Sequence, residues 1–284
     1  GVWAPMIVTG PRIGKTGFLK DLYNDLSERS VIYDQVHPDP TISQIEEMYQ
    51  IYQDHDCDSI IAIGGGSNMD AAKALAARVA RPDKSLQDMK GQLKVGRQVP
   101  FFVAVPTTAG TGSEATAAAV ITDCIDGKPY KYAVNDLCLI PDTAVLDPRL
   151  TISLPSSMTA DTGMDALTHA MEAFLNLFAS RIVQNASIEA VCENFHALPE
   201  AWRDGSRLAA RQEIMHRIWP VSLLPTTLSA TSMPLPTPSV HCTTFRTEEP
   251  TRFCCLLFCA NTVPALRLNL PSRRCAFSRR RYRF

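Results

Sequence analysis

Residues 59–80 read SIIAIGGGSNMDAAKALAARVA and predict a strand, a loop and a helix in succession. The segment 59–63 is short, apolar and rich in Ile, which is typical of a strand buried on both faces of a parallel sheet. Gly64, Gly65 and Gly66 then lack side chains, so their backbone N–H groups can approach a bulky anion closely. Two interpretations stay open for this stretch alone: a phosphate-binding loop, or a tight turn between strand and helix.

The predicted helix begins at Ser67, whose hydroxyl can cap it with Asp70 three positions later. Small and apolar residues then recur on one helical face, namely Met69, Ala72, Ala76 and Val79. Because unpaired N–H groups at a helix N-terminus favour an anion, this start suits a pyrophosphate.

Composition indicates a globular protein: 45% of the 284 residues are hydrophobic and 20% are charged. We expect no membrane-spanning segment, because no run of about 18 apolar residues occurs. Four of the nine cysteines are scattered singly through residues 1–216, which is typical of a reduced, cytoplasmic protein. The start, GVWAPMIVTG, has no initiator Met and no signal-peptide pattern, so we interpret it as a fragment or a processed end.

The net charge of −1 combines two unlike segments. Residues 1–216 carry 18 Lys and Arg against 27 Asp and Glu, a net charge of −9. Residues 217–284 carry 10 Arg against 2 Glu, a net charge of +8, with eight Pro, five Cys and no Lys, Asp or Gly. The change is abrupt, so we expect the folded part to end near residue 216.

Short apolar runs alternate with amphipathic segments through the first half of the chain. This order predicts an α/β domain with a parallel sheet, helices on both faces and ligands at the carboxyl ends of the strands. Residues 81–98 are polar and predict a surface connection. The expected strands are 6–9, 30–33, 59–63, 99–105, 130–134 and 137–146, the last of them broken by Pro141-Asp142, and helices are expected at 18–26 and 42–51.

A second loop, PTTAGTGSE (106–114), follows the strand 99–105. Its threonine and serine hydroxyls can bond phosphate and ribose oxygens, although an ordinary Ser/Thr-rich turn is the alternative. From Met158 onward the periodicity is helical. There Asp165 and His169 lie four residues apart, on one helical face, where a carboxylate and an imidazole can bind iron or zinc. A surface ion pair is the alternative interpretation.

Three segments occur in one order: GGGSNMDAAK, PTTAGTGSEAT and TADTGMDALTHAMEAF. Together they resemble the iron-containing (group III) alcohol dehydrogenases over about residues 6–215. The resemblance implies a dinucleotide-binding α/β domain (1–152), a partial all-helical metal-binding domain (153–216) of dehydroquinate synthase-like architecture, and an irregular, disordered tail (217–284) outside the family.

The resemblance also implies a site in the cleft between the two domains. The family's metal polarises the alcohol oxygen while hydride passes to the nicotinamide of NAD or NADP. Asp165 and His169 match the first two metal ligands. A small-molecule alcohol or aldehyde is the implied substrate, and a homodimer is the implied assembly. The positions that match cofactor-binding residues are Gly65, Gly66, Ser67, Thr107, Thr108, Thr111, Ser113, Lys131 and Leu150.

Two departures from the family pattern stand out. Gly10 occupies the place of the acidic residue that commonly holds the ribose diol of NAD, so we predict that NADP is accepted at least as well as NAD. The family's two further metal histidines lie in a downstream helix, whereas this chain offers only His196, His216 and His241, none in matching surroundings. We expect His196 and His216 to be surface or packing residues, which leaves the ligand set incomplete.

We interpret the tail as translated out of frame. The alternative is a genuine basic tail that binds RNA through SRRCAFSRRRYRF, but nucleic acid is not the expected partner. Two function classes follow: a metal-dependent alcohol dehydrogenase, or a catalytically inactive nucleotide-binding fragment. A glycerol dehydrogenase-like enzyme is a further alternative.

Overall fold

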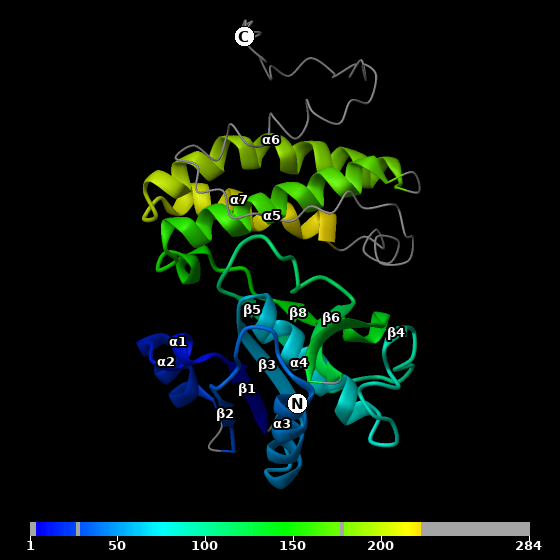
Figure 1. Ribbon diagram of the computed structural model, residues 1–284. Helices are drawn as coiled ribbons and strands as arrows, with labels where there is room; N and C mark the ends of the chain where they lie inside the picture. The colour runs from blue at the N-terminus through cyan, green and yellow to red at the C-terminus, as the bar shows by residue number, and fades with distance from the viewer. Residues whose placement is uncertain (1–3, 27–28, 126, 177–178, 223–284) are drawn as a thin grey trace, which may run out of the picture. The chain divides into compact units, whose positions relative to one another are not determined.

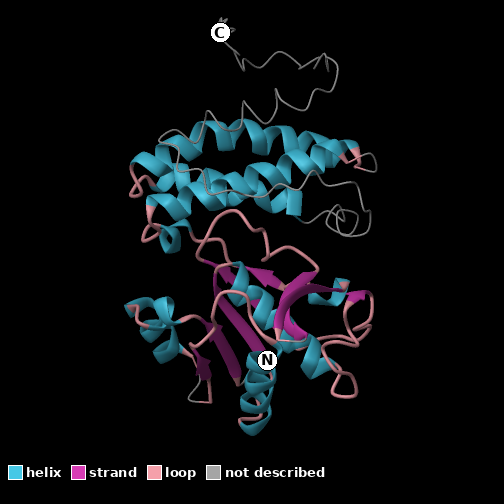
Figure 2. Cartoon of the chain, viewed as in Figure 1, coloured by secondary structure: helices cyan, strands magenta, loops and turns pink. Residues whose placement is uncertain are grey.

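The computed structural model describes residues 4–26, 29–125, 127–176 and 179–222 (Figure 1). Strands and helices alternate as far as residue 80, strands predominate from residue 91 to residue 144, and only helices follow from residue 156 (Figure 2). The strands are β1 (Pro5–Thr9), β2 (Val31–Tyr33), β3 (Ser59–Gly64), β4 (Gly91–Gln92), β5 (Phe101–Pro106), β6 (Ala118–Ile125), β7 (Lys128–Asn135) and β8 (Thr143–Ala144). The helices are α1 (Pro11–Gly14), α2 (Gly17–Asp25), α3 (Ile42–Asp54), α4 (Gly66–Ala80), α5 (Ser156–Leu175), α6 (Arg181–Arg203) and α7 (Leu208–Ser222), with short 3-10 helices η1 (Leu137–Leu139) and η2 (Pro148–Thr151).

The main sheet has the strand order β2-β1-β3-β5-β8, and every pair is parallel. This confirms the predicted parallel sheet. Ile63 pairs with Thr9 on one side and with Val105 on the other, and Gly64 pairs with Pro106. The glycine loop and the threonine-rich loop therefore leave the sheet side by side, at its carboxyl edge.

Both faces of the sheet are covered. Alternate residues such as Met6, Ile60 and Phe102 pack into a core with α3 and α4. The intervening residues, including Ile7 and Ile63, pack with Leu19 of α2. Burial on both faces explains why these strands are continuous apolar runs in the sequence.

The start of α4 differs from the prediction. The helix begins at Gly66 with Gly65 at its N-cap, and no side chain caps it. Ser67 therefore lies inside the first turn, and Asp70 turns inward, where its carboxylate accepts hydrogen bonds from the Ser113 hydroxyl and from the backbone of Val120. The predicted capping pair was wrong because Asp70 has partners within the protein core.

The predicted apolar face of α4 was correct but too narrow. Met69, Ala72 and Ala76 are fully buried, as expected, while Val79 is partly buried. The remaining faces of the helix also contribute buried residues, namely Ala71, Lys73, Ala74, Leu75 and Ala77.

A second, three-stranded sheet has the order β4-β7-β6, with β6 and β7 forming an antiparallel hairpin. The sequence analysis did not predict β6. For residues 137–146, predicted as a strand broken by Pro141-Asp142, it was right only after the break: Leu137–Leu139 form η1, and Thr143–Ala144 form the short strand β8. The connection 81–98, predicted to lie on the surface, is partly buried, because Leu86, Met89 and Val95 are fully buried.

Three helices make up the described chain after residue 155. Small residues allow α5 to approach α6 closely: a Cβ added at Gly163 would lie 2.3 Å from Leu198, and Asn194 donates a hydrogen bond to the Gly163 carbonyl. α7 packs on α6 through Ala210 and Ile214. Several large apolar side chains of these helices remain exposed, namely Leu175, Ile182, Phe195 and Leu208.

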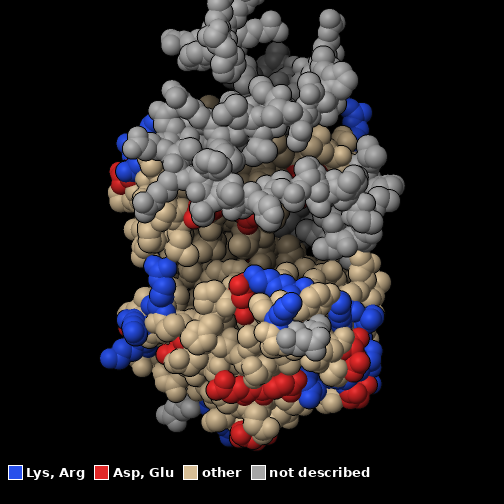
Figure 3. Space-filling view, viewed as in Figure 1, with Lys and Arg blue, Asp and Glu red and all other residues tan. Residues whose placement is uncertain are grey.

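α7 continues to Ser222, beyond the change of composition at residue 217. The rest of the predicted tail, including His241, lies outside the described residues. None of the helices in the described segments combines the length and the apolar character that spanning a membrane requires. Lys and Arg are interspersed with Asp and Glu on the face drawn in Figure 3, where no broad basic patch stands out among the described residues.

Candidate functional site

The glycine loop and the threonine-rich loop are joined where they leave the sheet. The Thr107 N–H donates a hydrogen bond to the Gly64 carbonyl at 2.8 Å. Gly64 has φ +151°, a conformation that residues with a side chain rarely adopt, and a Cβ there would lie 2.5 Å from Asn68. The turn after β3 therefore requires glycine.

Threonine side chains lie directly over the two following glycines. A Cβ added at Gly65 would lie 3.4 Å from Thr108, and one at Gly66 would lie 3.1 Å from Thr111 and 3.6 Å from the Ser113 hydroxyl. The structure thus brings together six of the predicted cofactor positions, and Ser67 follows them in the first turn of α4. The glycine backbone therefore faces the Thr108 and Ser113 hydroxyls and the Thr111 methyl group at close range.

Two polar atoms in this region are buried without a partner among the described residues. They are the Thr108 hydroxyl and the side-chain nitrogen Nδ2 of Asn68. Asn68 lies between the turns after β1 and β3, since a Cβ at Gly10 would be 3.2 Å from its Nδ2. Sequence reasoning missed Asn68, because its importance depends on a contact with Gly10. Unpaired buried groups are costly, so they suit a site that a polar ligand completes.

A buried charge cluster supports the threonine-rich loop from behind. Lys73 is fully buried, and its Nζ donates to the Thr116 carbonyl at 2.6 Å, the Thr116 hydroxyl at 2.9 Å and the Ala118 carbonyl at 3.1 Å. Burial lowers the pKa of Lys73 to about 8, although Asp70 and Glu114 oppose this shift. Burial also raises the pKa of Asp70 to about 6 and raises that of Glu114. The cluster ties α4 to residues 113–118.

Lys131 and Leu150, the last two predicted cofactor positions, belong to neither of the two loops. Lys131 is half-exposed on β7, and its Nζ lies 2.6 Å from the Asp39 carboxylate. Leu150 is partly buried in η2 and packs on the cluster that contains Ile63 and Val105 at the carboxyl ends of β3 and β5. Leu150 is therefore near the edge where both loops start, whereas Lys131 is held by an acidic residue of another loop.

The turn after β1 contains Gly10 and α1. Asp34, which follows β2, lies against Gly14, where an added Cβ would be 2.7 Å from its carboxylate. Arg12 is exposed in the same turn. A carboxylate and a guanidinium thus flank this turn, and sequence reasoning had considered neither of them.

The threonine-rich loop also contacts the helix that carries the predicted metal ligands. A Cβ added at Gly110 would lie 2.0 Å from the backbone carbonyl of Thr162 in α5. One turn further along α5, the His169 Nε2 lies 3.8 Å from the Asp165 Oδ1, and both side chains are 40–46% exposed. Burial raises the pKa of Asp165, and the adjacent His169 opposes that shift.

Asp165 and His169 thus share one face, as predicted, and their carboxylate and imidazole fit a divalent transition metal. No third ligand joins them: among the described residues, no group of three or more His, Cys, Asp or Glu side chains is placed to hold a metal ion. His196 and His216 are exposed, which confirms that they are surface residues.

Comparison with known families agrees with this geometry. The family model described as "Iron-containing alcohol dehydrogenase" matches residues 2–148, more than half of the chain. The chain belongs to the iron-containing alcohol dehydrogenase family. A second model, for the family's C-terminal part, matches residues 159–219.

The chain is similar to a choline dehydrogenase of Bacillus subtilis, with 33% identity over 74% of this chain and 53% of that protein. It is also similar to an NAD-dependent methanol dehydrogenase of Bacillus methanolicus, with 34% identity over 76% of this chain and 57% of that protein. The chain therefore spans little more than half the length of these curated relatives.

Solved structures show the same fold. An alcohol dehydrogenase from Oenococcus oeni superposes with a TM-score of 0.74 at 30% identity, over 80% of this chain and 60% of that one. A sulfoacetaldehyde reductase from Bifidobacterium kashiwanohense, solved in complex with NAD+, superposes with a TM-score of 0.71 at 28% identity, over 78% and 59% of the two chains.

Proposed function

We propose that this chain binds NAD or NADP where the glycine loop meets the threonine-rich loop. We further propose that it is part of a metal-dependent oxidoreductase, which transfers hydride between an alcohol and the corresponding aldehyde or ketone. The observation that carries the proposal is the close contact between the bare backbone of Gly65 and Gly66 and the side chains of Thr108 and Thr111. The fold and the family support it.

The two loops offer the groups that a dinucleotide needs. The first N–H groups of α4 have no acceptor within the helix and would hold the pyrophosphate. The unpartnered Thr108 hydroxyl, with those of Ser67 and Thr111, would donate to phosphate or ribose oxygens. The Ser113 hydroxyl donates to Asp70, so it would accept a hydrogen bond from a ribose hydroxyl. Thr107 would hold the loop to β3, as its hydrogen bond to Gly64 indicates. We propose Lys131 and Leu150 as further cofactor contacts on family resemblance alone.

Asp165 and His169 would hold two coordination positions of a divalent iron or zinc ion. Such a metal supplies a Lewis acid that polarises the alcohol oxygen. The remaining ligands would come from outside the described residues. The domain limits 1–152 and 153–216, a homodimeric assembly and a cytoplasmic location remain parts of this proposal.

The second candidate function is a nucleotide-binding protein without catalytic activity. It is favoured by the absence of a third metal-binding side chain near Asp165 and His169 in the described segments. Both candidates predict dinucleotide binding, and only the first predicts a bound metal and turnover. A glycerol dehydrogenase-like activity would be seen with a polyol in place of a simple alcohol.

The test is purification of the full chain, metal analysis, and assay with simple alcohols, glycerol and both dinucleotides. Near-stoichiometric iron or zinc with turnover would establish the oxidoreductase and refute the out-of-frame interpretation of the tail. Binding of dinucleotide without metal or turnover would leave the second candidate. In that case the nucleotide sequence around codon 216 decides whether a frame change that encodes further histidines restores both metal and activity.

A further inference from the structure

The threonine-rich loop contacts two different parts of the chain with four consecutive residues. Thr108 and Thr111 lie close to the backbone of the glycine loop, at the proposed dinucleotide site. Between them, Ala109 and Gly110 form the tip of the loop, and this tip packs against the helices that follow residue 155. A displacement of the tip would therefore move both threonines away from the glycine loop.

The tip fits tightly against α5. A Cβ added at Gly110 would lie 2.0 Å from the carbonyl oxygen of Thr162 and 3.0 Å from its Cα. No residue with a side chain fits there unless the helix or the loop shifts, because Cβ atoms do not approach backbone atoms so closely. The position of the tip is thus set by the backbone of α5.

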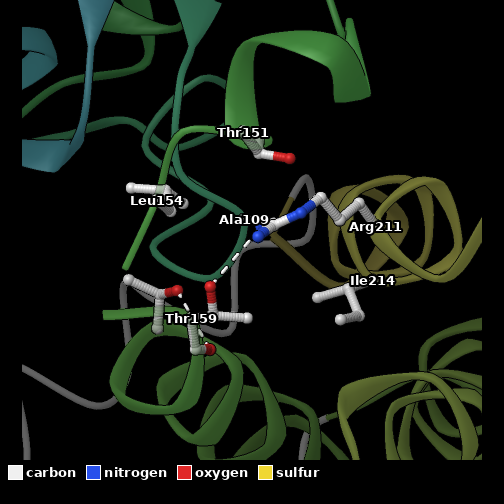
Figure 4. A pocket seen from close by; sticks show the side chains of 7 residues that line it. Ala109, Thr151, Leu154, Thr159, Arg211 and Ile214 are labelled. Atoms are coloured by element: carbon white, nitrogen blue, oxygen red, sulfur yellow. Dashed lines mark hydrogen bonds between the residues drawn. The ribbon is translucent and has the colours of Figure 1, made fainter. Parts of the chain in front are cut away.

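Ala109 lies between α5 and α7. It packs on the apolar cluster of α6 and α7 that includes Ile214. Thr159 of α5, together with Arg211 and Ile214 of α7, lines the same small cavity as Ala109 (Figure 4). The cavity has a volume of about 10 Å³, at the lower limit for one water molecule, so these side chains fit closely. Arg211 also links the two helices, since its Nη1 donates to the Thr159 hydroxyl at 3.4 Å.

Packing positions the tip, because backbone hydrogen bonds do not. In the part of the chain that the structure describes, the backbone of residues 108–111 makes no hydrogen bond to another backbone group. The hydrogen bonds that tie this segment to the sheet and to α4 lie on either side of the tip: the Thr107 N–H donates to Gly64, and Lys73 donates to Thr116. The placement of the two threonines therefore depends on the helices.

We propose that Ala109 and Gly110 are positioning residues, through which α5 and α7 hold Thr108 and Thr111 at the dinucleotide site. The inference rests on the proposed dinucleotide binding and deepens it, because it makes the helices part of the binding unit without a contact to the ligand. Coupling between two sites is reciprocal, so a bound dinucleotide also stabilises the packing of α7 against the loop and α5. This coupling requires neither a bound metal nor turnover.

The test is calorimetric titration of the full chain and its variants with NAD and NADP. Ile214→Ala removes apolar atoms of α7 beside Ala109 and should weaken binding at least about fivefold, the lower end of the usual coupling between sites. Ile214→Val, the conservative variant, should keep most of the affinity. Val183→Ala is the matched control, because it truncates a buried side chain in the separate cluster of α5 and α6. It should lower stability through a cavity but leave the affinity unchanged.

Equal affinity of Ile214→Ala and the unaltered chain, or an equal loss in Val183→Ala, would overturn the inference and leave the proposed function standing. No binding by the unaltered chain would overturn the proposed function and the inference with it. If Ile214→Ala does not fold, hydrogen exchange of the unaltered chain decides. Either dinucleotide should slow exchange at residues 210–215 of α7 as well as in both loops, and slowing confined to the loops would refute the coupling.

Discussion

Replacing Lys73 by Met tests the claim that a buried charge cluster holds the threonine-rich loop in place. Met fills a similar volume but cannot donate hydrogen bonds. The change leaves three acceptors of Thr116 and Ala118 without their donor. It also removes the positive charge near Asp70 and Glu114, both of which lie in low-dielectric surroundings.

The expected cost follows from the burial of Lys73. Removing one partner of a buried charged group destabilises a protein by about 3–5 kcal/mol, because the remaining charges are uncompensated. This is a large part of the roughly 5–15 kcal/mol that stabilise a typical domain. Adding Asp70→Asn to the variant should recover part of the loss, because it removes one uncompensated carboxylate.

The assay is urea unfolding with linear extrapolation to water. Lys20→Met is the matched control, because Lys20 is exposed on α2 and its replacement should change stability by no more than about 0.5 kcal/mol. A loss below about 1 kcal/mol for Lys73→Met would refute the reasoning, since the cluster would then contribute little more than a surface pair.

Three further predictions concern the same region. Gly110→Ala should destabilise the chain by about 1–3 kcal/mol in urea unfolding, because its Cβ would lie 2.0 Å from the Thr162 carbonyl, whereas Gly17→Ala has open space and should be nearly neutral. Burial raises the pKa of Asp70 from 3.8 to about 6, so folding favours its protonated form. The free energy of unfolding of the unaltered chain, relative to that of Asp70→Asn, should therefore fall by on the order of 2–3 kcal/mol as pH rises through that interval. Urea unfolding at several pH values measures this difference, and a difference that does not change with pH would contradict the prediction. Thr108→Val should leave stability unchanged, because it removes an unpartnered hydroxyl, yet weaken dinucleotide binding about three- to tenfold in calorimetric titration; equal affinity would remove Thr108 from the site.

The sequence predicted the central sheet well, and the reason is physical. β1, β3 and β5 are buried on both faces, so each is a largely apolar run. β3 and β5 end in Gly64 and Pro106, and Gly10 follows β1. α3 shows clear helical periodicity through Ile45 and Met48, both fully buried. The sequence also predicted correctly that both candidate loops lie at the carboxyl edge of the sheet, because the carboxyl ends of parallel strands lie at the same edge.

The features that were missed depend on partners far away in the sequence. Lys73 reads as an ordinary helical lysine, yet it bonds Thr116, 43 residues later. The side chain of Asn68 lies against Gly10, and the Arg211 guanidinium donates a hydrogen bond to Thr159 of another helix. β6 was missed because Thr122 and Asp123 interrupt its apolar run, AAVITDCI, which forms a strand by pairing with β7.

Hydrogen exchange of the full chain, with and without NAD or NADP, tests the central claim most directly. The two loops are proposed to close on one dinucleotide, so exchange should slow at residues 64–68 and 107–113 together when either cofactor is added. Residues on the exposed side of α6 should be unaffected and serve as an internal control. Unchanged exchange in both loops at saturating concentrations of each dinucleotide would contradict the proposed site.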